Sequence, residues 1–84
     1  MGKIIDPRKF GLHPKTVIED IGKDRFAIVI MRKSRIIMSD GKKILEKAEK
    51  IRTYHPRAKI GLKTSAPLCS KTVAFLREHK IEII

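Results

Sequence analysis

Short apolar runs and amphipathic segments alternate along the second half of the chain. Residues 36–38 form an apolar run, and 58–63 and 81–84 are short apolar segments interrupted by a few charged residues, so each of the three predicts a strand. Apolar residues recur at helical spacing over 42–54 and 67–79, so each of these segments predicts an amphipathic helix. The order predicts strand, helix, strand, helix, strand, with parallel strands joined by right-handed crossovers.

The segment 42–54 has the clearest helical pattern. Ile44, Ala48 and Ile51 form one apolar stripe, and the opposite side is charged. Ser39 or Asp40 precedes the helix as a candidate N-terminal cap. The dipeptide His55-Pro56 ends it, because proline interrupts the helical hydrogen bonds.

The first third of the chain has a less regular pattern. Pro14 suits a first helical position, and Val17, Ile18 and Ile21 follow at helical spacing, which predicts a short helix over 14–21. The segment Lys3-Ile4-Ile5 is either a short strand or an anchoring tail. Residues 1–12 are expected to be partly irregular.

Residues 26–31 form another apolar run, separated from 36–38 by the polar residues Arg32-Lys33-Ser34-Arg35. This spacing predicts a hairpin whose first strand is antiparallel to its neighbour. The expected fold class is therefore α/β. It comprises a mixed four-stranded sheet in two or three layers and a short N-terminal helix.

Length and composition limit the possible classes of protein. Eighty-four residues fit one domain, 1–84, and no apolar run is long enough to span a membrane. A single cysteine excludes an internal disulfide, so we expect a cytoplasmic protein. The chain has fourteen isoleucines and no asparagine or glutamine, a composition that predicts a thermophilic source.

The charge is strongly positive. Twenty Lys and Arg residues oppose nine Asp and Glu residues, giving a net charge of +11 spread along the whole chain. Such a domain attracts polyanions, although solubility alone is an alternative reason for the charge. The acidic residues form no pair with catalytic spacing, and three dispersed histidines supply no metal site. We expect a non-catalytic protein without metal or cofactor.

Two predicted loops carry the candidate binding residues. Loops that follow successive parallel strands meet at one sheet edge, so 39–43 and 64–71 should lie together at two helix N-termini. An ordinary capping role is the alternative for their hydroxyl residues. The predicted phosphate-binding residues are Lys42, Lys43, Lys63, Thr64, Ser65, Ser70 and Lys71, and Arg32, Lys33 and Arg35 extend the predicted site.

Cys69 is the one cysteine of the chain. Its place near a helix N-terminus, with Lys71 close by, would suit a nucleophile of lowered pKa. It also falls on the apolar stripe of Val73 and Leu76, and no histidine is placed to meet it. We therefore favour a buried structural thiol.

Two segments resemble known families over part of their length, and neither assigns the chain to a family. Ala66-Pro67-Leu68-Cys69, followed by a helix and Ile81-Glu82, resembles the start of a glutaredoxin, with Ala66 in place of the first cysteine. The pattern from Gly41 to Ile81 resembles the α-β-α ribosomal proteins that bind kink-turn RNA. Lys43-Ile44 stands where those proteins carry an Asn-Glu pair.

The sequence thus favours a non-catalytic module that binds nucleic acid, RNA rather than DNA, mainly through phosphates. Few aromatic residues are available for base stacking. One alternative is a site for a small phosphate or another anion. Another is a structural domain that binds an acidic protein or forms a homodimer through a sheet edge.

Overall fold

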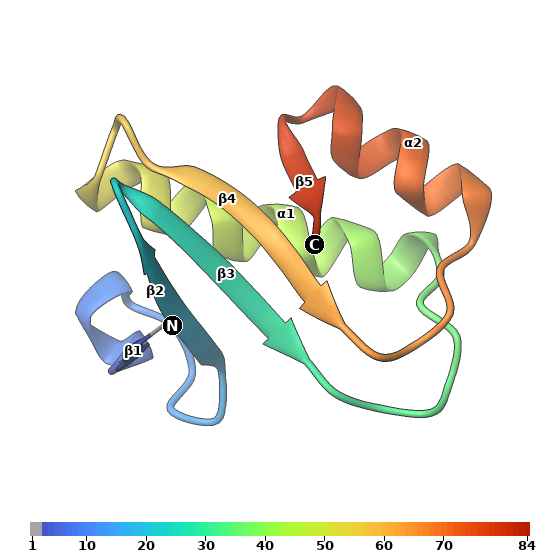
Figure 1. Cartoon of the computed structure of the whole chain (residues 1–84), viewed down its shortest axis with the longest axis horizontal. Helices are drawn as coiled ribbons and strands as arrows, with labels where there is room; N and C mark the ends of the chain where they lie inside the picture. Colours follow the sequence, from blue (N-terminus) through green and yellow to red (C-terminus); the bar gives the residue numbers. More distant parts are fainter. Residues whose placement is uncertain (1–2) are drawn as a thin grey trace.

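The chain folds into a mixed five-stranded sheet with two α-helices (Figure 1). The computed structural model describes residues 3–84. A 3-10 helix, η1 (Pro7–Phe10), connects the first two strands. The α-helices are α1 (Met38–Tyr54) and α2 (Ser70–Glu78), and the strands are β1 (Lys3–Ile5), β2 (Val17–Gly22), β3 (Arg25–Ile30), β4 (Lys59–Thr64) and β5 (Ile81–Ile83).

The strand order in the sheet, β1-β2-β3-β4-β5, is the same as the order in the chain. Strands β1, β2 and β3 form an antiparallel meander, and β3, β4 and β5 are parallel. Both crossovers step in the same direction along the sheet. Because such crossovers are right-handed, α1 and α2 lie on the same face, and the domain has two layers (Figure 1).

The core lies between this helical layer and the sheet. Ile44, Ala48 and Ile51 of α1 are buried in one cluster with the inward-facing residues of the parallel strands. Those strand residues are Phe26, Ile28, Ile60, Leu62 and Ile81. The predicted apolar stripe of this helix is therefore its buried face.

Phe10 of η1 closes the core at the end of the sheet formed by the antiparallel strands. It is buried, and its ring meets the ring of Phe26 edge-on at a centroid distance of 5.8 Å. The ring centroids of Phe10 and His55 are 5.7 Å apart. This aromatic group fixes η1 against the end of α1.

The predicted helix over 14–21 is wrong. Residues Val17–Gly22 form β2, in which Ile18 is buried and Val17 is exposed on the opposite side. The apolar positions fit helical spacing, but pairing on both sides decides the conformation, because β2 lies between β1 and β3. The sheet therefore has five strands rather than four.

The predicted hairpin between 26–31 and 36–38 is also wrong. The hairpin joins β2 and β3 through Lys23 and Asp24, which both have positive φ. Ile36 forms an isolated bridge with Leu68, and Met38 begins α1. As a result β3, not 36–38, is the strand parallel to β4, and β3 is antiparallel only to β2.

The two helices touch at Gly41, a buried position in the second turn of α1. A Cβ atom at this position would lie 3.0 Å from Thr72 Cγ2 and 3.5 Å from the Phe75 ring. Glycine thus permits the close approach of α2 to α1.

The substitution Gly41→Val should destabilise the fold by about 1–3 kcal/mol, because its side chain must displace α2 or distort its rotamers. Urea unfolding monitored by circular dichroism measures this change. Glu49→Val, at an exposed position of the same helix, is the matched control for helix propensity and should cost less than about 1 kcal/mol. Equal losses in the two variants would contradict the close packing at Gly41.

Candidate functional site

Two loops lie together at the carboxyl edge of the parallel strands. The loop 31–37 follows β3, and the loop 65–69 follows β4. Backbone hydrogen bonds join them: Ile36 N donates to Pro67 O at 2.9 Å, and Cys69 N donates to Ile36 O at 3.0 Å. The expected meeting of two loops at one edge is therefore present, although its first loop is 31–37. Residues 39–43, which were expected to be a loop, belong to α1.

The N-terminus of α1 holds a carboxylate from its own first turn. Asp40 Oδ2 accepts a hydrogen bond from Ile37 N at 3.1 Å and from Arg32 Nη2 at 2.6 Å. Arg32 also donates to the carbonyl oxygens of Ser34 and Arg35. The hydrogen bond from Arg32 and that from the Ile37 amide lower the pKa of Asp40. Asp40 and Arg32 thus form an ion pair beside the start of α1, and Arg32 is committed to the loop.

At the N-terminus of α2, Cys69 is the N-cap residue. The backbone N–H groups of Lys71 and Thr72 favour the thiolate, and the positive charge of Arg35 adds to their effect. Together they lower the pKa of Cys69. The side chain is half-buried, whereas a buried thiol was expected. In the sequence Cys69 falls on the apolar stripe of Val73 and Leu76, but in the structure it lies just before the first residue of α2.

Three of the predicted cations remain exposed around the joined loops. Lys33 and Arg35 lie in the loop 31–37, and Lys71 lies in the first turn of α2. Arg35 is near enough to Cys69 to affect its pKa. Ser65 and Ser70 are exposed beside them, whereas the Thr64 hydroxyl accepts a hydrogen bond from Ala66 N within the loop. We call Lys33, Arg35 and Lys71, with Ser65 and Ser70, the loop rim.

The remaining predicted lysines lie elsewhere. Lys63 is on the sheet, where its Nζ is 3.5 Å from Glu19 Oε1. Lys42 is exposed on α1. Lys43 lines a different cavity, of about 300 Å³, beside the segment that leads into β2. That cavity is also lined by Leu12, His13, Thr16, Glu46, Lys47 and Lys50.

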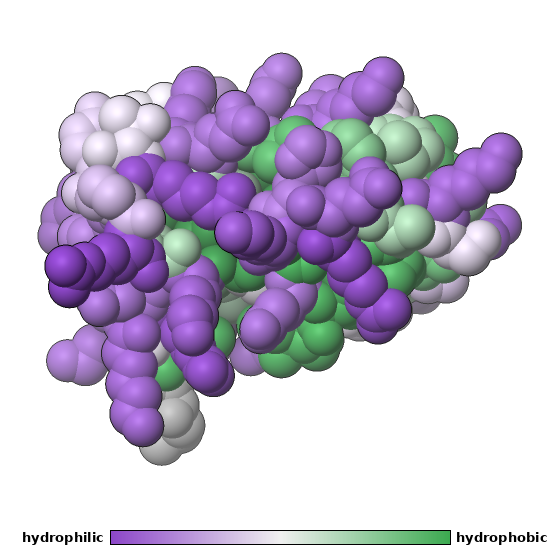
Figure 2. All heavy atoms as spheres, turned by 90° about the horizontal axis from the view of Figure 1, so that it is seen from above, coloured by the Kyte–Doolittle hydropathy of each residue, from purple (hydrophilic) through white to green (hydrophobic). Residues whose placement is uncertain are grey.

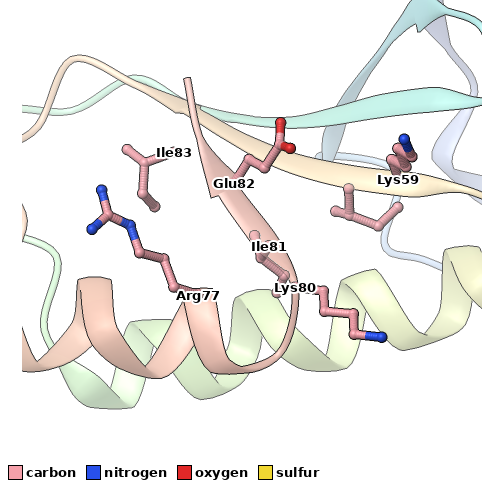
Figure 3. A pocket seen from close by; sticks show the side chains of 7 residues that line it. Lys59, Arg77, Lys80, Ile81, Glu82 and Ile83 are labelled. Carbon is pink, nitrogen blue, oxygen red and sulfur yellow. The ribbon is translucent and has the colours of Figure 1, made fainter.

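Sequence reasoning missed a second group of cations, at the amino edge of the parallel strands. Lys59, Arg77 and Lys80 line a cavity of about 490 Å³ along β5. In Figure 3, Arg77 lies on one side of the β5 ribbon, and Lys59 and Lys80 lie on the other. Lys59 begins β4, and Lys80 immediately precedes β5. Their positions at the starts of neighbouring parallel strands could have identified this group from the sequence.

Most of the positive charge has no acidic partner. Within residues 3–84, ion pairs involve three of the twenty Lys and Arg residues: Arg8 with Asp6, Arg32 with Asp40, and Lys63 with Glu19. Figure 2 shows one side of the molecule, where hydrophilic side chains extend over most of the surface with hydrophobic atoms between them. The domain therefore presents a strong positive potential to solvent.

Other kinds of site find no support in the described part of the chain. Residues 3–84 contain no cluster of three or more His, Cys, Asp or Glu side chains arranged to hold a metal ion. Neither helix in that range has the length and apolar character needed to cross a membrane.

Comparison with known proteins gives no relative. No protein-family model matches the chain, and neither a curated protein nor a solved structure matches it.

The Asp40 contacts predict a pH-dependent contribution to stability. Because the folded-state pKa of Asp40 is lowered, this contribution is complete above the ordinary aspartate pKa of about 4 and is lost as pH falls through the folded-state value. Asp40→Asn should destabilise the fold at pH 7 by about 1 kcal/mol, and the difference from the wild type should shrink in acid. Urea unfolding at pH 7 and pH 3 tests this. A difference that is the same at both pH values would contradict the role of the charge.

The position of Cys69 predicts an unusually reactive thiol. Alkylation by iodoacetamide should accelerate at a lower pH in the folded chain than in the chain unfolded by urea, because folding lowers the pKa of Cys69. Arg35→Ala should move the folded-state profile toward higher pH, whereas Lys15→Ala, on the segment before β2, should leave it unchanged. Coincident profiles for folded and unfolded chains would contradict this prediction.

Proposed function

We propose that this protein is a non-catalytic module that binds nucleic acid through its phosphates, with RNA as the expected ligand. The observation that carries the proposal is the unpaired positive charge: a net +11, with few ion pairs among residues 3–84. A polyanion gains affinity from many such cations at once, because each neutralised phosphate releases condensed counterions.

The loop rim is the proposed centre of the interface. Lys33, Arg35 and Lys71 are exposed on segments that backbone hydrogen bonds hold together, so the backbone keeps these three cations in one region of the surface. Ser65 and Ser70 add exposed hydroxyl groups that can donate to phosphate oxygens. Lysine and arginine on a rigid base provide a suitable surface for a phosphate backbone.

The aromatic residues favour phosphate contacts over base stacking. Phe10 and Phe26 are buried, and Phe75 is half-buried between the helices. Tyr54 is exposed, but it lies at the end of α1. Without a row of exposed rings, sequence preference should be weak.

The small-anion alternative has less support. A phosphate bound at a helix N-terminus uses free amides and the helix dipole. Here Asp40 lies at the start of α1, and Cys69 lies at the start of α2. A carboxylate thus lies beside the start of α1, where it repels a small anion, and at α2 the backbone N–H groups of Lys71 and Thr72 face the Cys69 thiol.

A binding experiment with matched charge variants tests the proposal. Fluorescence anisotropy of mixed-sequence RNA and DNA oligonucleotides should show an affinity for RNA that falls steeply with salt. The triple variant Lys33→Glu, Arg35→Glu, Lys71→Glu should bind more than ~10-fold more weakly, and the slope of log K against log salt should decrease by roughly 2–3.

The control is the triple variant Lys59→Glu, Arg77→Glu, Lys80→Glu, which changes the net charge equally but alters the cavity along β5. It should retain most of the affinity. Equal losses in both variants would mean that the charge acts without a defined interface. No binding by the wild type at low salt would overturn the proposed function.

A further inference from the structure

One face of the sheet has no layer packed on it within residues 3–84. Both α-helices lie on the face that carries Ile28 and Leu62, and η1 packs against α1 on that same side. Successive side chains of a strand point to opposite faces, so Ala27, Val29 and Gly61 belong to the other face. The strand register aligns further residues with them. We call this surface the open face: Ile4, Val17, Glu19, Arg25, Ala27, Val29, Lys59, Gly61, Lys63, Glu82 and Ile84.

The open face carries large apolar side chains that remain in contact with solvent. Ile4 is 68% exposed, Val17 is 40% exposed and Ile84 is 57% exposed. The Ile84 side chain lies over Gly61, since a Cβ atom added at Gly61 would be 2.5 Å from Ile84 Cδ1. Ala27 is completely buried beneath its larger neighbours. The surface is therefore partly apolar.

Its charge differs from that of the rest of the molecule. The open face carries two carboxylates, Glu19 and Glu82, and three cations, Arg25, Lys59 and Lys63. At its centre Lys63 Nζ lies 3.5 Å from both carboxylate oxygens of Glu19. Nearly all of the net charge of +11 thus lies on other surfaces.

We infer that the open face binds the open face of a second copy of this chain. The remaining surfaces of two copies repel each other, whereas two open faces meet with nearly balanced charge. In a two-fold arrangement the Lys63–Glu19 pairs of the copies come close, and each lysine keeps further donors for the carboxylate of the other copy. A nucleic acid would gain little from a face that carries two carboxylates and exposed apolar groups.

The size of the open face predicts a weak dimer. Three strands of six residues are about 20 Å long and two strands of three residues are about 10 Å long, so at a spacing of about 4.8 Å they cover roughly 400 Å² of each copy, or about 800 Å² in total. This is below the ~1,000 Å² typical of a stable specific interface, so association should be weak and should depend on concentration.

Salt provides a test of the mechanism. Added salt screens the repulsion between two copies of high net charge, while the apolar contact is unaffected or strengthened. Self-association should therefore increase with salt, in the opposite direction to nucleic-acid binding. The two ideas fail separately, because each is measured in its own experiment.

Sedimentation equilibrium of the full chain, from micromolar to millimolar concentration at low and high salt, measures the association. The average mass should rise from 9.6 kDa toward twice that value, and should do so at lower protein concentration in high salt. A mass of 9.6 kDa under all these conditions would overturn the inference.

Point substitutions locate the contact. Val17→Lys and Ile84→Lys should each weaken association at least ~10-fold, because a charge is placed in the apolar contact. Ile37→Lys adds the same charge at a residue 49% exposed on the loop before α1, and it should associate like the wild type. Ile84→Lys keeps the test valid if Val17→Lys fails to fold.

Nuclear magnetic resonance spectra recorded on dilution map the contact independently. Shift changes confined to Val17, Val29 and Ile84 and their strand neighbours would support the inference. Changes on α1 and α2 instead would overturn it. A chain that stays monomeric, and whose open-face signals shift when an RNA oligonucleotide is added, would also overturn the inference.

Discussion

The packing of α1 on the parallel pair β3 and β4 determines most of this structure. One buried stripe, Ile44, Ala48 and Ile51, meets apolar residues of both strands, and the right-handed connection fixes the side on which this occurs. The second crossover repeats the same geometry with α2. One layer of helices follows, with both connecting loops at one edge of the sheet and the opposite sheet face uncovered.

In this arrangement the groups at the helix N-termini are distinct from the exposed cations of the surface. Asp40 pairs with Arg32 beside the start of α1, and Cys69 is the N-cap residue of α2. The groups left for a ligand are then long, exposed cations, which attract phosphates without dictating their exact geometry. Affinity of this kind depends on the number of cations and on salt, which suits a polymer better than a small molecule. The more neutral sheet face is suited to a different kind of contact.

The sequence predicted the part of the fold in which local pattern and tertiary environment agree. The helix stripe of α1, the termination at Pro56 and the strands β4 and β5 follow from periodicity and proline chemistry. Strand β2 was missed because Val17, Ile18 and Ile21 recur at helical spacing, and pairing with two neighbouring strands overrides that local pattern. The turn at Lys23-Asp24 lacks the usual turn dipeptides, so the hairpin was assigned to the polar stretch after β3 instead. In the candidate site, sequence order placed two loops at one edge. It did not predict that Arg32 would pair with Asp40, because that contact depends on the fold of the loop.

The strand order carries a consequence for the folding pathway. Every strand pairs with its immediate neighbour in the chain, so each new strand joins the edge of the sheet already formed. No strand has to insert between two others. The meander of β1, β2 and β3 pairs locally, through the turn at Lys23 and Asp24, whereas β3 and β4 pair only after the whole of α1 has intervened, as at Arg25 and Lys59. The meander can therefore form first as the polypeptide leaves the ribosome, and the slower parallel pairing must wait until α1 and β4 have followed.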